Sequence, residues 1–239
     1  MTPDEFATLF AVPRGTLERL ARYEALLRDH QRRMNLVASS TLADVWGRHF
    51  ADSAQLAAVV PPGRHWLDVG SGAGFPGLVL ALLGHGPVTL VESVAKKCRF
   101  LHAAAAELGL EAQVRVIHAR IERLPPQGAQ VITARATASL DRLLDWTLVH
   151  GGPGALWVLP KGRTWAREVA AARARFRFDL GLVVSRTDPE ARILLLKDPA
   201  RKAGPCAPSR SPTRKAESAR RPPPSTSPPR SRPPADAFS

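Results

Sequence analysis

Cysteine is scarce in this 239-residue sequence, which contains only Cys98 and Cys206. Two cysteines exclude a disulfide-dense scaffold and a cysteine-rich zinc site. No run of about 18 apolar residues occurs, so no segment is expected to span a membrane. The seven histidines lack ligand spacings such as HExxH, and we therefore expect no metal. The opening segment MTPDEFATLF is acidic where a signal peptide is basic, which argues against export.

Acidic residues are outnumbered as well, with 21 Asp and Glu against 34 Lys and Arg, and the net charge is +13. A surplus of this sign favours a polyanionic partner. Residues 198–239 distort the total, because they hold nine basic and three acidic residues and 11 of the 22 prolines. Residues 1–197 therefore carry +7, which is a moderate basic balance.

Residues 198–239 contain one large apolar residue, Phe238, so we predict a disordered, basic, Pro-rich tail. One interpretation is an arm that adds affinity for nucleic acid. The other comes from back-translation. Read one base earlier, the codons for Ser209–Ser227 can encode a sequence that resembles the P-loop of bacterial chromosome-partitioning ATPases. We favour this second interpretation, in which the tail is out-of-frame translation into a neighbouring gene.

Helical patterns dominate the beginning of the chain. Thr2-Pro3-Asp4-Glu5 is a typical helix start, and an Arg-rich helix is expected from about Thr16. Another helical stretch is expected from about Leu42 to Val60 and ends at Pro61-Pro62-Gly63. We therefore predict an N-terminal helical extension over residues 1–62. The expected core contacts of its last helix are Trp46, Phe50 and Leu56.

Residues 63–197 alternate short apolar runs, such as HWLDVG, VTLVES and QVITARA, with helical patterns. This alternation predicts an α/β domain with a mostly parallel sheet that is covered on both faces. The last two strand-like runs, LGLVVS and ARILLLK, are joined only by RTDPE. A connection this short suits a hairpin, so we expect the last strand to be antiparallel.

A glycine-rich turn, LDVGSGAGFPG, follows the first expected strand and marks a nucleotide crevice. Gly72-x-Gly74-x-x-Gly77 fits the dinucleotide pattern. Asp68-x-Gly70-x-Gly72-x-Gly74 fits the S-adenosylmethionine turn, in which an acid before the glycines suits a cationic ligand without a pyrophosphate. Dinucleotide turns usually carry an apolar residue at the position of Asp68, so we favour S-adenosylmethionine. A merely tight structural loop is the third interpretation.

Two further positions follow the next strands. Glu92 ends the strand LVES, where a carboxylate can accept both ribose hydroxyls of an adenosine. An exposed strand-end carboxylate is the alternative, and dinucleotide enzymes place an acid similarly. Ile121-Glu122 follows the strand VRVIHA, where an apolar side chain and backbone amides could hold an adenine ring, although a surface helix start explains it equally well.

The Asp/Asn-Pro-Pro-Tyr/Phe motif of enzymes that methylate exocyclic amines is missing after the strand VITARA. Cys98 lies in an apolar helix and is expected to be inert core rather than a nucleophile. A ring nitrogen with a free lone pair, such as guanine N7, needs neither device, because it attacks the methyl group directly and no proton leaves. In-line positioning then carries the catalysis, and we assign no general base.

These features together resemble the bacterial 16S rRNA guanine-N7 methyltransferases, also called the glucose-inhibited division protein B family. The resemblance covers about Thr16 to Lys197. The ordered combination of motifs is specific, although each motif alone is not. The matching motifs are Asn35-Leu36, Arg48-His49-Phe50-x-Asp52-Ser53, the LDVGSGAGFPG turn, VES with Lys96-Lys97 and Phe100-Leu101, Ala134-Arg135-Ala136 with Ser139-Leu140, and Lys161-Gly162.

The resemblance implies a cytoplasmic enzyme with the Rossmann-like methyltransferase fold. It implies transfer of a methyl group from S-adenosylmethionine to N7 of one guanosine in the decoding-region loop of small-subunit rRNA. We expect a monomer whose partner is 16S rRNA or the small ribosomal subunit. The tail departs from the family pattern, which stops soon after the last strand. The cofactor contacts would lie at Gly70, Phe75, Ile121-Glu122 and Arg135, with Gly72, Gly74 and Glu92 beside them.

Arg48, His49 and Lys161 are the candidate RNA contacts, since cations at this edge could hold phosphates or guanine O6. The alternatives are an ion-pair role for Arg48, a core-edge imidazole at His49 and a plain surface position for Lys161. Asp52 could simply orient Arg48 or His49. The Arg-rich helix could follow rRNA phosphates, but a solvated charged face is the default, and the tryptophans are expected in the core.

Three rival functions remain open. The first is a methyltransferase with another substrate, opposed by the lack of amine- or thiol-handling motifs. The second is a nicotinamide-dependent oxidoreductase, opposed by Asp68. The third is a non-catalytic RNA-binding module with a vestigial pocket.

Overall fold

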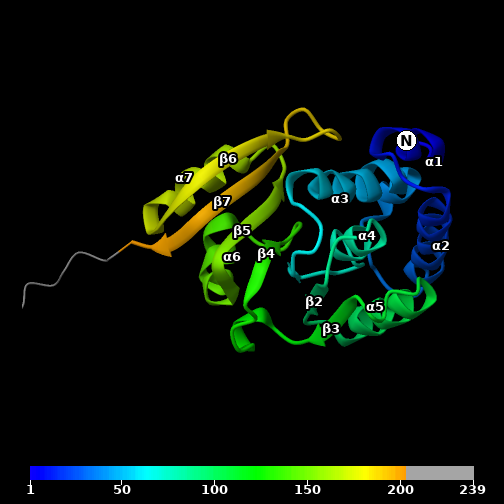
Figure 1. Ribbon diagram of the computed structural model, residues 1–239, viewed down its shortest axis with the longest axis horizontal. Coiled ribbons are helices and arrows are strands. Elements are labelled where there is room, and N and C mark those ends of the chain that lie inside the picture. The colour runs from blue at the N-terminus through cyan, green and yellow to red at the C-terminus, as the bar shows by residue number, and fades with distance from the viewer. Residues whose placement is uncertain (203–239) are drawn as a thin grey trace, which may run out of the picture. The chain divides into compact units, whose positions relative to one another are not determined.

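The first 62 residues are helical in the computed structural model, which describes residues 1–202 (Figure 1). Helix α1 (Pro3–Phe10) starts as predicted, because the Thr2 hydroxyl accepts from the Glu5 N–H and the Glu5 carboxylate accepts from the Thr2 N–H. Helix α2 (Arg14–Gln31) follows. The helical stretch expected from about Leu42 to Val60 is present as an unbroken run of short helical segments of different type: η1 (Ser39–Asp44), η2 (Trp46–Ala51), α3 (Asp52–Ala54) and η3 (Gln55–Val59).

A seven-stranded sheet follows, with the order β3-β2-β1-β4-β5-β7-β6. Its strands alternate with helices along the chain, as the apolar runs predict. The strands are β1 (Trp66–Val69), β2 (Val88–Glu92), β3 (Val114–His118), β4 (Ala129–Thr133), β5 (Gly151–Lys161), β6 (Phe176–Val184) and β7 (Arg192–Arg201). The helices between them are α4 (Gly77–Leu82), α5 (Ala95–Glu107), η4 (Ile121–Arg123), α6 (Leu140–Thr147), η5 (Leu148–His150) and α7 (Trp165–Arg175).

The pairing confirms the predicted fold class. Strands β1 to β5 pair in parallel, and β7 pairs antiparallel with both β5 and β6. The last strand is therefore the antiparallel one, as the short RTDPE connection indicates. It continues to Arg201, past the boundary predicted at residue 197. The rest of the predicted tail, from residue 203 onward, lies outside the described residues.

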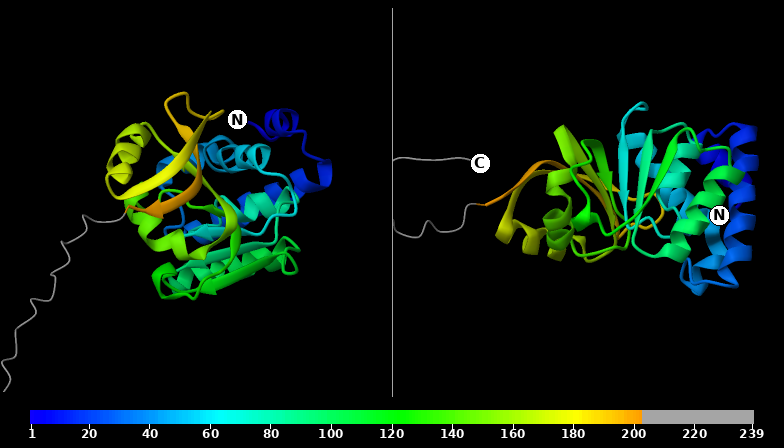
Figure 2. Two further views of the ribbon diagram at one scale, coloured as in Figure 1. Left: turned by 60° about the vertical axis from the view of Figure 1, so that its left-hand side comes forward. Right: turned by 90° about the horizontal axis from the view of Figure 1, so that it is seen from below.

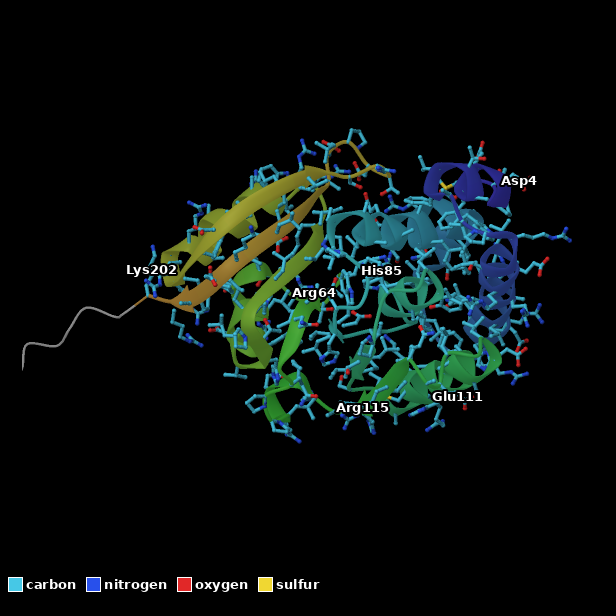
Figure 3. All side chains as sticks on the ribbon, in the orientation of Figure 1. Asp4, Arg64, His85, Glu111, Arg115 and Lys202 are labelled. Atoms are coloured by element: carbon cyan, nitrogen blue, oxygen red, sulfur yellow. The ribbon has the colours of Figure 1, made fainter. Side chains whose placement is uncertain are left out.

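Helices lie on both faces of the sheet (Figure 2), and each face has its own hydrophobic core. On one face, the N-terminal helices pack with α4 and α5, and the expected contacts Trp46, Phe50 and Leu56 are buried there. On the other face, α6 and α7 pack against the sheet. Figure 3 shows side chains filling the space between these layers. Residues 1–62 thus share one core with the sheet, and residues 1–202 form one compact unit.

The carboxyl ends of the parallel strands meet at one edge of the sheet, where the glycine-rich turn also lies. Within residues 1–202, no helix has both the length and the apolar character needed to cross a bilayer.

Candidate active site

The glycine-rich turn has the backbone that its composition predicts. Gly70, Gly72 and Gly74 have φ of +70°, +58° and +94°, a region that side chains rarely adopt. A Cβ at Gly70 would lie 2.7 Å from the Thr137 side chain. The turn therefore needs glycine both for its conformation and for its close approach to the segment that follows β4.

Asp68, on strand β1 just before the turn, holds the other end of the turn in place. Its side chain is fully buried, and Oδ2 accepts a hydrogen bond of 3.1 Å from the N–H of Gly77 at the start of α4. Burial raises the pKa of Asp68 to about 7. Asp68 has no exposed surface, so its carboxylate does not contact a ligand directly. Its observed role is to support the turn.

Glu92 clamps the turn from the end of β2. Its Oε2 accepts a 2.9 Å hydrogen bond from Gly72 N–H, and its Oε1 accepts a 2.8 Å bond from Val94 N–H. The side chain is 6% exposed. A carboxylate offers about four acceptor positions, so acceptor capacity remains for ligand hydroxyls. The interpretation of Glu92 as an exposed strand-end carboxylate does not fit this geometry.

The N-terminal helices hold the other side of the turn. Tyr23 from α2 donates a hydrogen bond to the carbonyl oxygen of Ala73, and its ring stacks on Phe75 with centroids 5.3 Å apart. Phe75 also packs against Phe50 and is 3% exposed. The Phe75 side chain is therefore part of the support, and a contact between Phe75 and a cofactor has to come chiefly from its backbone.

Two clefts lie on either side of Gly70. The smaller, which we call the Ile121 cleft, has a volume of about 150 Å³ and is bounded by Val69, Gly70, Val91, Ile121, Glu122, Thr137 and Trp146. The larger, which we call the Arg135 cleft, has about 420 Å³ and is bounded by Val37, Arg48, Asp52, Gly70, Gly72, Phe75, Lys97, Arg135 and Ala136. Most of the residues predicted to bind a cofactor therefore line two clefts that share Gly70.

A third space, the Lys161 cleft, continues from the Arg135 cleft toward β5 and the β6–β7 turn. It has a volume of about 260 Å³. Both clefts share the residues Arg48, Asp52, Arg135 and Ala136. The residues that only the Lys161 cleft contains include Gln55, Pro160, Lys161, Glu168, Thr187, Asp188 and Arg192. One path thus leads along the carboxyl edge of the sheet from Ile121 to Lys161.

Arg135 lies at the shared wall and ties the end of β4 to the N-terminal helices. Its Nη1 donates to the Arg48 carbonyl oxygen at 3.1 Å and to Asp52 Oδ2 at 3.3 Å. Its Nη2 donates to His49 Nδ1 at 2.9 Å, and the guanidinium lies 5.0 Å from the Phe75 ring centroid. Asp52 therefore orients Arg135, not Arg48 or His49 as the sequence suggested.

His49 is a correction to the predicted RNA contacts. Its ring is buried against Phe75, with centroids 4.8 Å apart, and both ring nitrogens have partners, Arg135 at Nδ1 and Thr41 at Nε2. Burial, together with the nearby charges of Arg135 and Arg48, lowers the pKa of His49 to about 3. A neutral, enclosed imidazole fits the core-edge alternative and not a phosphate contact.

Arg48 and Lys161 differ in how their charges are used. Arg48 is exposed, borders both larger clefts and has no ion pair among residues 1–202. Lys161 is only 10% exposed, and its Nζ donates to Glu168 Oε2 and to the Ala138 carbonyl oxygen, each at 2.8 Å. Neither alternative proposed for these residues holds, since Arg48 is not ion-paired and Lys161 is not a plain surface residue.

Several functional positions were missed by the sequence reasoning. Tyr23 lies 50 positions before the turn that it contacts, and Glu168, seven residues after Lys161, belongs to no motif that the sequence analysis used. Ala136 has a φ of +52°, uncommon for a residue with a side chain, and such outliers gather at functional sites. Ala136 is the last residue of the segment VITARA and belongs to the Ala134-Arg135-Ala136 motif, which is the sequence signal that points to it. Cys98 is buried in α5, as expected of inert core, and burial raises its thiol pKa.

Comparison with known proteins agrees with this geometry. Residues 16–192 match the model of the GidB family, described as rRNA small subunit methyltransferase G. The chain belongs to this family. It is 48% identical over 195 residues to the ribosomal RNA small subunit methyltransferase G of Rhodospirillum centenum, which covers 81% of this chain and 89% of the relative. It is 45% identical over 202 residues to the protein of the same name from Paramagnetospirillum magneticum, covering 84% and 98%.

Solved structures show the same fold at low identity. TYW2 of M. jannaschii in complex with AdoMet superposes with a TM-score of 0.52 at 12% identity, over 72% of this chain and 80% of that one. A SAM-dependent methyltransferase from Aquifex aeolicus gives a TM-score of 0.51 at 16% identity, over 64% and 91%. The family expected from the sequence motifs and the Rossmann-like methyltransferase fold are therefore both confirmed.

Proposed function

We propose that this protein transfers the methyl group of S-adenosylmethionine to N7 of a specific guanosine in 16S rRNA. The observation that carries the proposal is the row of three clefts along the carboxyl edge of the sheet. A glycine cradle separates the Ile121 cleft from the Arg135 cleft, and the latter opens into the Lys161 cleft. Such a path provides a cofactor site and an adjacent substrate site along one edge of the sheet.

The residues present fit S-adenosylmethionine. A Cβ at Gly72, which lines the Arg135 cleft, would meet only the Gly70 carbonyl oxygen at 3.8 Å, so the space beside this glycine is open to a ligand. The Ile121 cleft offers Val69, Ile121 and the Ile121-Glu122 backbone to an adenine ring, and Glu92 beside it offers acceptors to the ribose hydroxyls. The Arg135 cleft is then left for the methionine part. When bound, the cofactor supplies an electrophilic methyl group on a positively charged sulfur.

The chain's own residues position the reactants in this mechanism. Guanine N7 carries a free lone pair, so the N7–carbon bond forms as the carbon–sulfur bond breaks. No proton leaves, and the guanine gains the charge that the sulfur loses. His49 is neutral and enclosed, and Asp52 accepts from Arg135, so neither is placed to act as a base. In-line positioning can supply about 7–11 kcal/mol in well-oriented reactions.

Arg48 is the cation best placed for RNA, because it is exposed at the mouth of both larger clefts. Phosphate contacts of this kind fix the position of an RNA without reading its sequence. The protein acts, in this proposal, as a cytoplasmic monomer on 16S rRNA or on the small ribosomal subunit.

The test uses the purified full chain, labelled S-adenosylmethionine and small ribosomal subunits from cells that lack the gene. We expect label in 16S rRNA, recovered as N7-methylguanosine at one position after nucleoside analysis. Label in protein or in a small molecule would favour a methyltransferase with another substrate. Tight binding of NAD in place of S-adenosylmethionine, measured by calorimetry, would favour the oxidoreductase. Binding of RNA without any transfer would favour the non-catalytic module.

A further inference from the structure

The Lys161 cleft contains an ion pair that methyl transfer itself does not require. Lys161 ends β5, and Glu168 lies in the first turns of α7, where its Oε2 accepts from Lys161 Nζ at 2.8 Å. The two side chains are 10% and 22% exposed, and both line the cleft. A cation and a carboxylate therefore stand next to each other on the same wall.

Neighbouring groups hold this pair in place. Lys161 Nζ also donates to the Ala138 carbonyl oxygen, and Glu168 Oε2 also accepts from Leu140 N–H at 3.1 Å. Glu168 Oε1 accepts from the Thr164 hydroxyl at 3.2 Å. An ammonium has three donors and a carboxylate about four acceptor positions. One donor on Lys161 and further acceptor capacity on Glu168 are thus left for a ligand, side by side.

A donor beside an acceptor is the complement of the Watson–Crick edge of guanine. That edge presents the O6 acceptor next to the N1–H and N2–H donors. Adenine presents the reverse order, an N6–H donor next to the N1 acceptor, and would bring like groups together at Lys161 and Glu168. Enzymes that modify a base read it by this edge once it has left the stack.

The arrangement of the clefts fits this orientation of the base. The wall that the Lys161 cleft shares with the Arg135 cleft consists of Arg48, Asp52, Arg135 and Ala136. Lys161 and Glu168 belong only to the Lys161 cleft. In guanine, N7 lies on the side of the ring away from N1–H and N2–H. N7 lies next to O6, so a guanine whose O6 meets Lys161 has N7 on the Lys161 side of the ring, and the orientation proposed below requires the Arg135 cleft to open on that side.

We propose that the Lys161–Glu168 pair selects guanine, with Lys161 donating to O6 and Glu168 accepting from N2–H through the one acceptor position left on its Oε1. The proposal rests on the function proposed above and adds to it the residues that read the base. Asp52 does not take this role, because its oxygens already accept from Arg135, Gln55 and Thr187 and it lies at the shared wall.

The same contact strengthens during the reaction. Methylation at N7 places a positive charge on the guanine ring, which makes N1–H and N2–H better donors. A carboxylate held at that edge binds the developing cation more tightly than the neutral base, and such interactions raise the rate of the chemical step.

The experiment compares guanosine with inosine, which lacks only the 2-amino group and keeps N7. Small-subunit rRNA is assembled by splinted ligation with either nucleoside at the methylated position, and initial rates are measured with labelled S-adenosylmethionine. For the wild-type chain we expect the guanosine substrate to react about 10- to 100-fold faster, as loss of one charge-assisted hydrogen bond implies. In Glu168→Gln we expect this ratio to fall by at least about fivefold.

The ratio of the guanosine rate to the inosine rate is measured for each variant separately. A lower amount of folded enzyme reduces both rates equally and leaves this ratio unchanged. Glu111→Gln is the matched control, because Glu111 is exposed near α5, away from β5 and α7 (Figure 3). It should keep the wild-type ratio. Glu168→Asp serves as a second variant, in which the shorter carboxylate should also lower the ratio. Equal wild-type rates on both substrates, or an unchanged ratio in the Glu168 variants, would overturn the proposal. No transfer to the guanosine substrate at all would instead contradict the proposed function.

Discussion

The two ends of the cleft path are built differently. The side chains that hold the glycine-rich turn in place are buried. Tyr23, Phe75 and Asp68 are each 3% exposed or less. Around the Lys161 cleft, the supports are ion pairs that remain partly exposed, Arg135 with Asp52 and Lys161 with Glu168. The end proposed for the cofactor, called the cofactor end below, is therefore fixed by the core. The end proposed for the substrate, called the substrate end below, is fixed by charges that a polar ligand can reach.

This difference matches the two ligands. A cofactor of constant shape is bound well by a rigid, preformed cradle. A nucleotide within a large RNA arrives with phosphates and a polar base edge, which charged side chains can meet by exchanging one partner for another. The following predictions test the comparison, from the largest expected effect to the smallest.

Glu92→Ala should have the largest effect, and it should act on the cofactor end alone. The substitution removes the acceptor for the ribose hydroxyls and releases Gly72 N–H from its 2.9 Å hydrogen bond. We expect S-adenosylmethionine affinity to fall by about 1.5–3 kcal/mol, measured by calorimetry. Glu107→Ala, an exposed position on α5, is the control. Unchanged affinity in Glu92→Ala would remove Glu92 from the cofactor site.

Tyr23→Phe should loosen the cofactor end through the core. The change leaves the Ala73 carbonyl oxygen without its buried donor while keeping the stacking on Phe75. We expect a loss of about 1–2 kcal/mol in the free energy of unfolding by urea titration, together with a few-fold weaker cofactor binding. A variant that unfolds and binds like the wild type would show that the α2 contact does not shape the turn.

His49→Gln should change how stability depends on pH. The His49 pKa of about 3 lies below the unfolded value of 6.5, so the unfolded chain takes up this proton first and stability falls as the pH drops from 6.5 toward 3. The Asp68 pKa of about 7 lies above its unfolded value of 3.8, so this group loses stability as the pH rises from 3.8 to 7. The two effects oppose each other in the wild type.

Removing His49 leaves the Asp68 effect unopposed. Relative to the wild type, His49→Gln should gain stability on acidification, by at most about 1.4 kcal/mol per pH unit between about pH 6 and 4. Urea unfolding midpoints across this range provide the measurement. Parallel pH profiles for the two proteins would mean that His49 takes up its proton in the native state.

Arg48→Ala should have the smallest effect and act only at the substrate end. We expect RNA binding to weaken by less than about 1 kcal/mol, and the dependence of affinity on salt to lose about one phosphate contact. Arg64→Ala, an exposed cation just before β1 (Figure 3), is the matched control. If both variants show the same salt dependence as the wild type, Arg48 does not contact phosphate.

The sequence motifs predicted the cofactor end better than the substrate end. Local signals suffice for a glycine turn between a strand and a helix, and the positive φ angles at Gly70, Gly72 and Gly74 follow directly from them. The antiparallel last strand was also predicted, because the short RTDPE connection suits a hairpin, whereas the strand order was not. Glu92 was found because it ends the neighbouring strand, beside the turn.

The rest depended on contacts between distant segments. Tyr23 meets the turn across 50 positions of sequence, and Arg135 meets His49 across 86. A histidine side chain can carry a positive charge. Only its surroundings in the structure, burial against Phe75 beside Arg135, show that the pKa of His49 is lowered and that the ring is neutral. Likewise, the helix that carries Glu168 was predicted correctly, whereas its pairing with Lys161 depends on how α7 packs against the end of β5.

The position of β7 within the sheet has a consequence for biosynthesis. This strand is the last in sequence among the described residues, yet it lies between β5 and β6, and Ala191 to Ile193 line the Lys161 cleft. A nascent chain can complete the glycine turn long before residues 192–201 emerge from the ribosome. The Lys161 cleft, which we propose as the pocket for the target base, is therefore completed last.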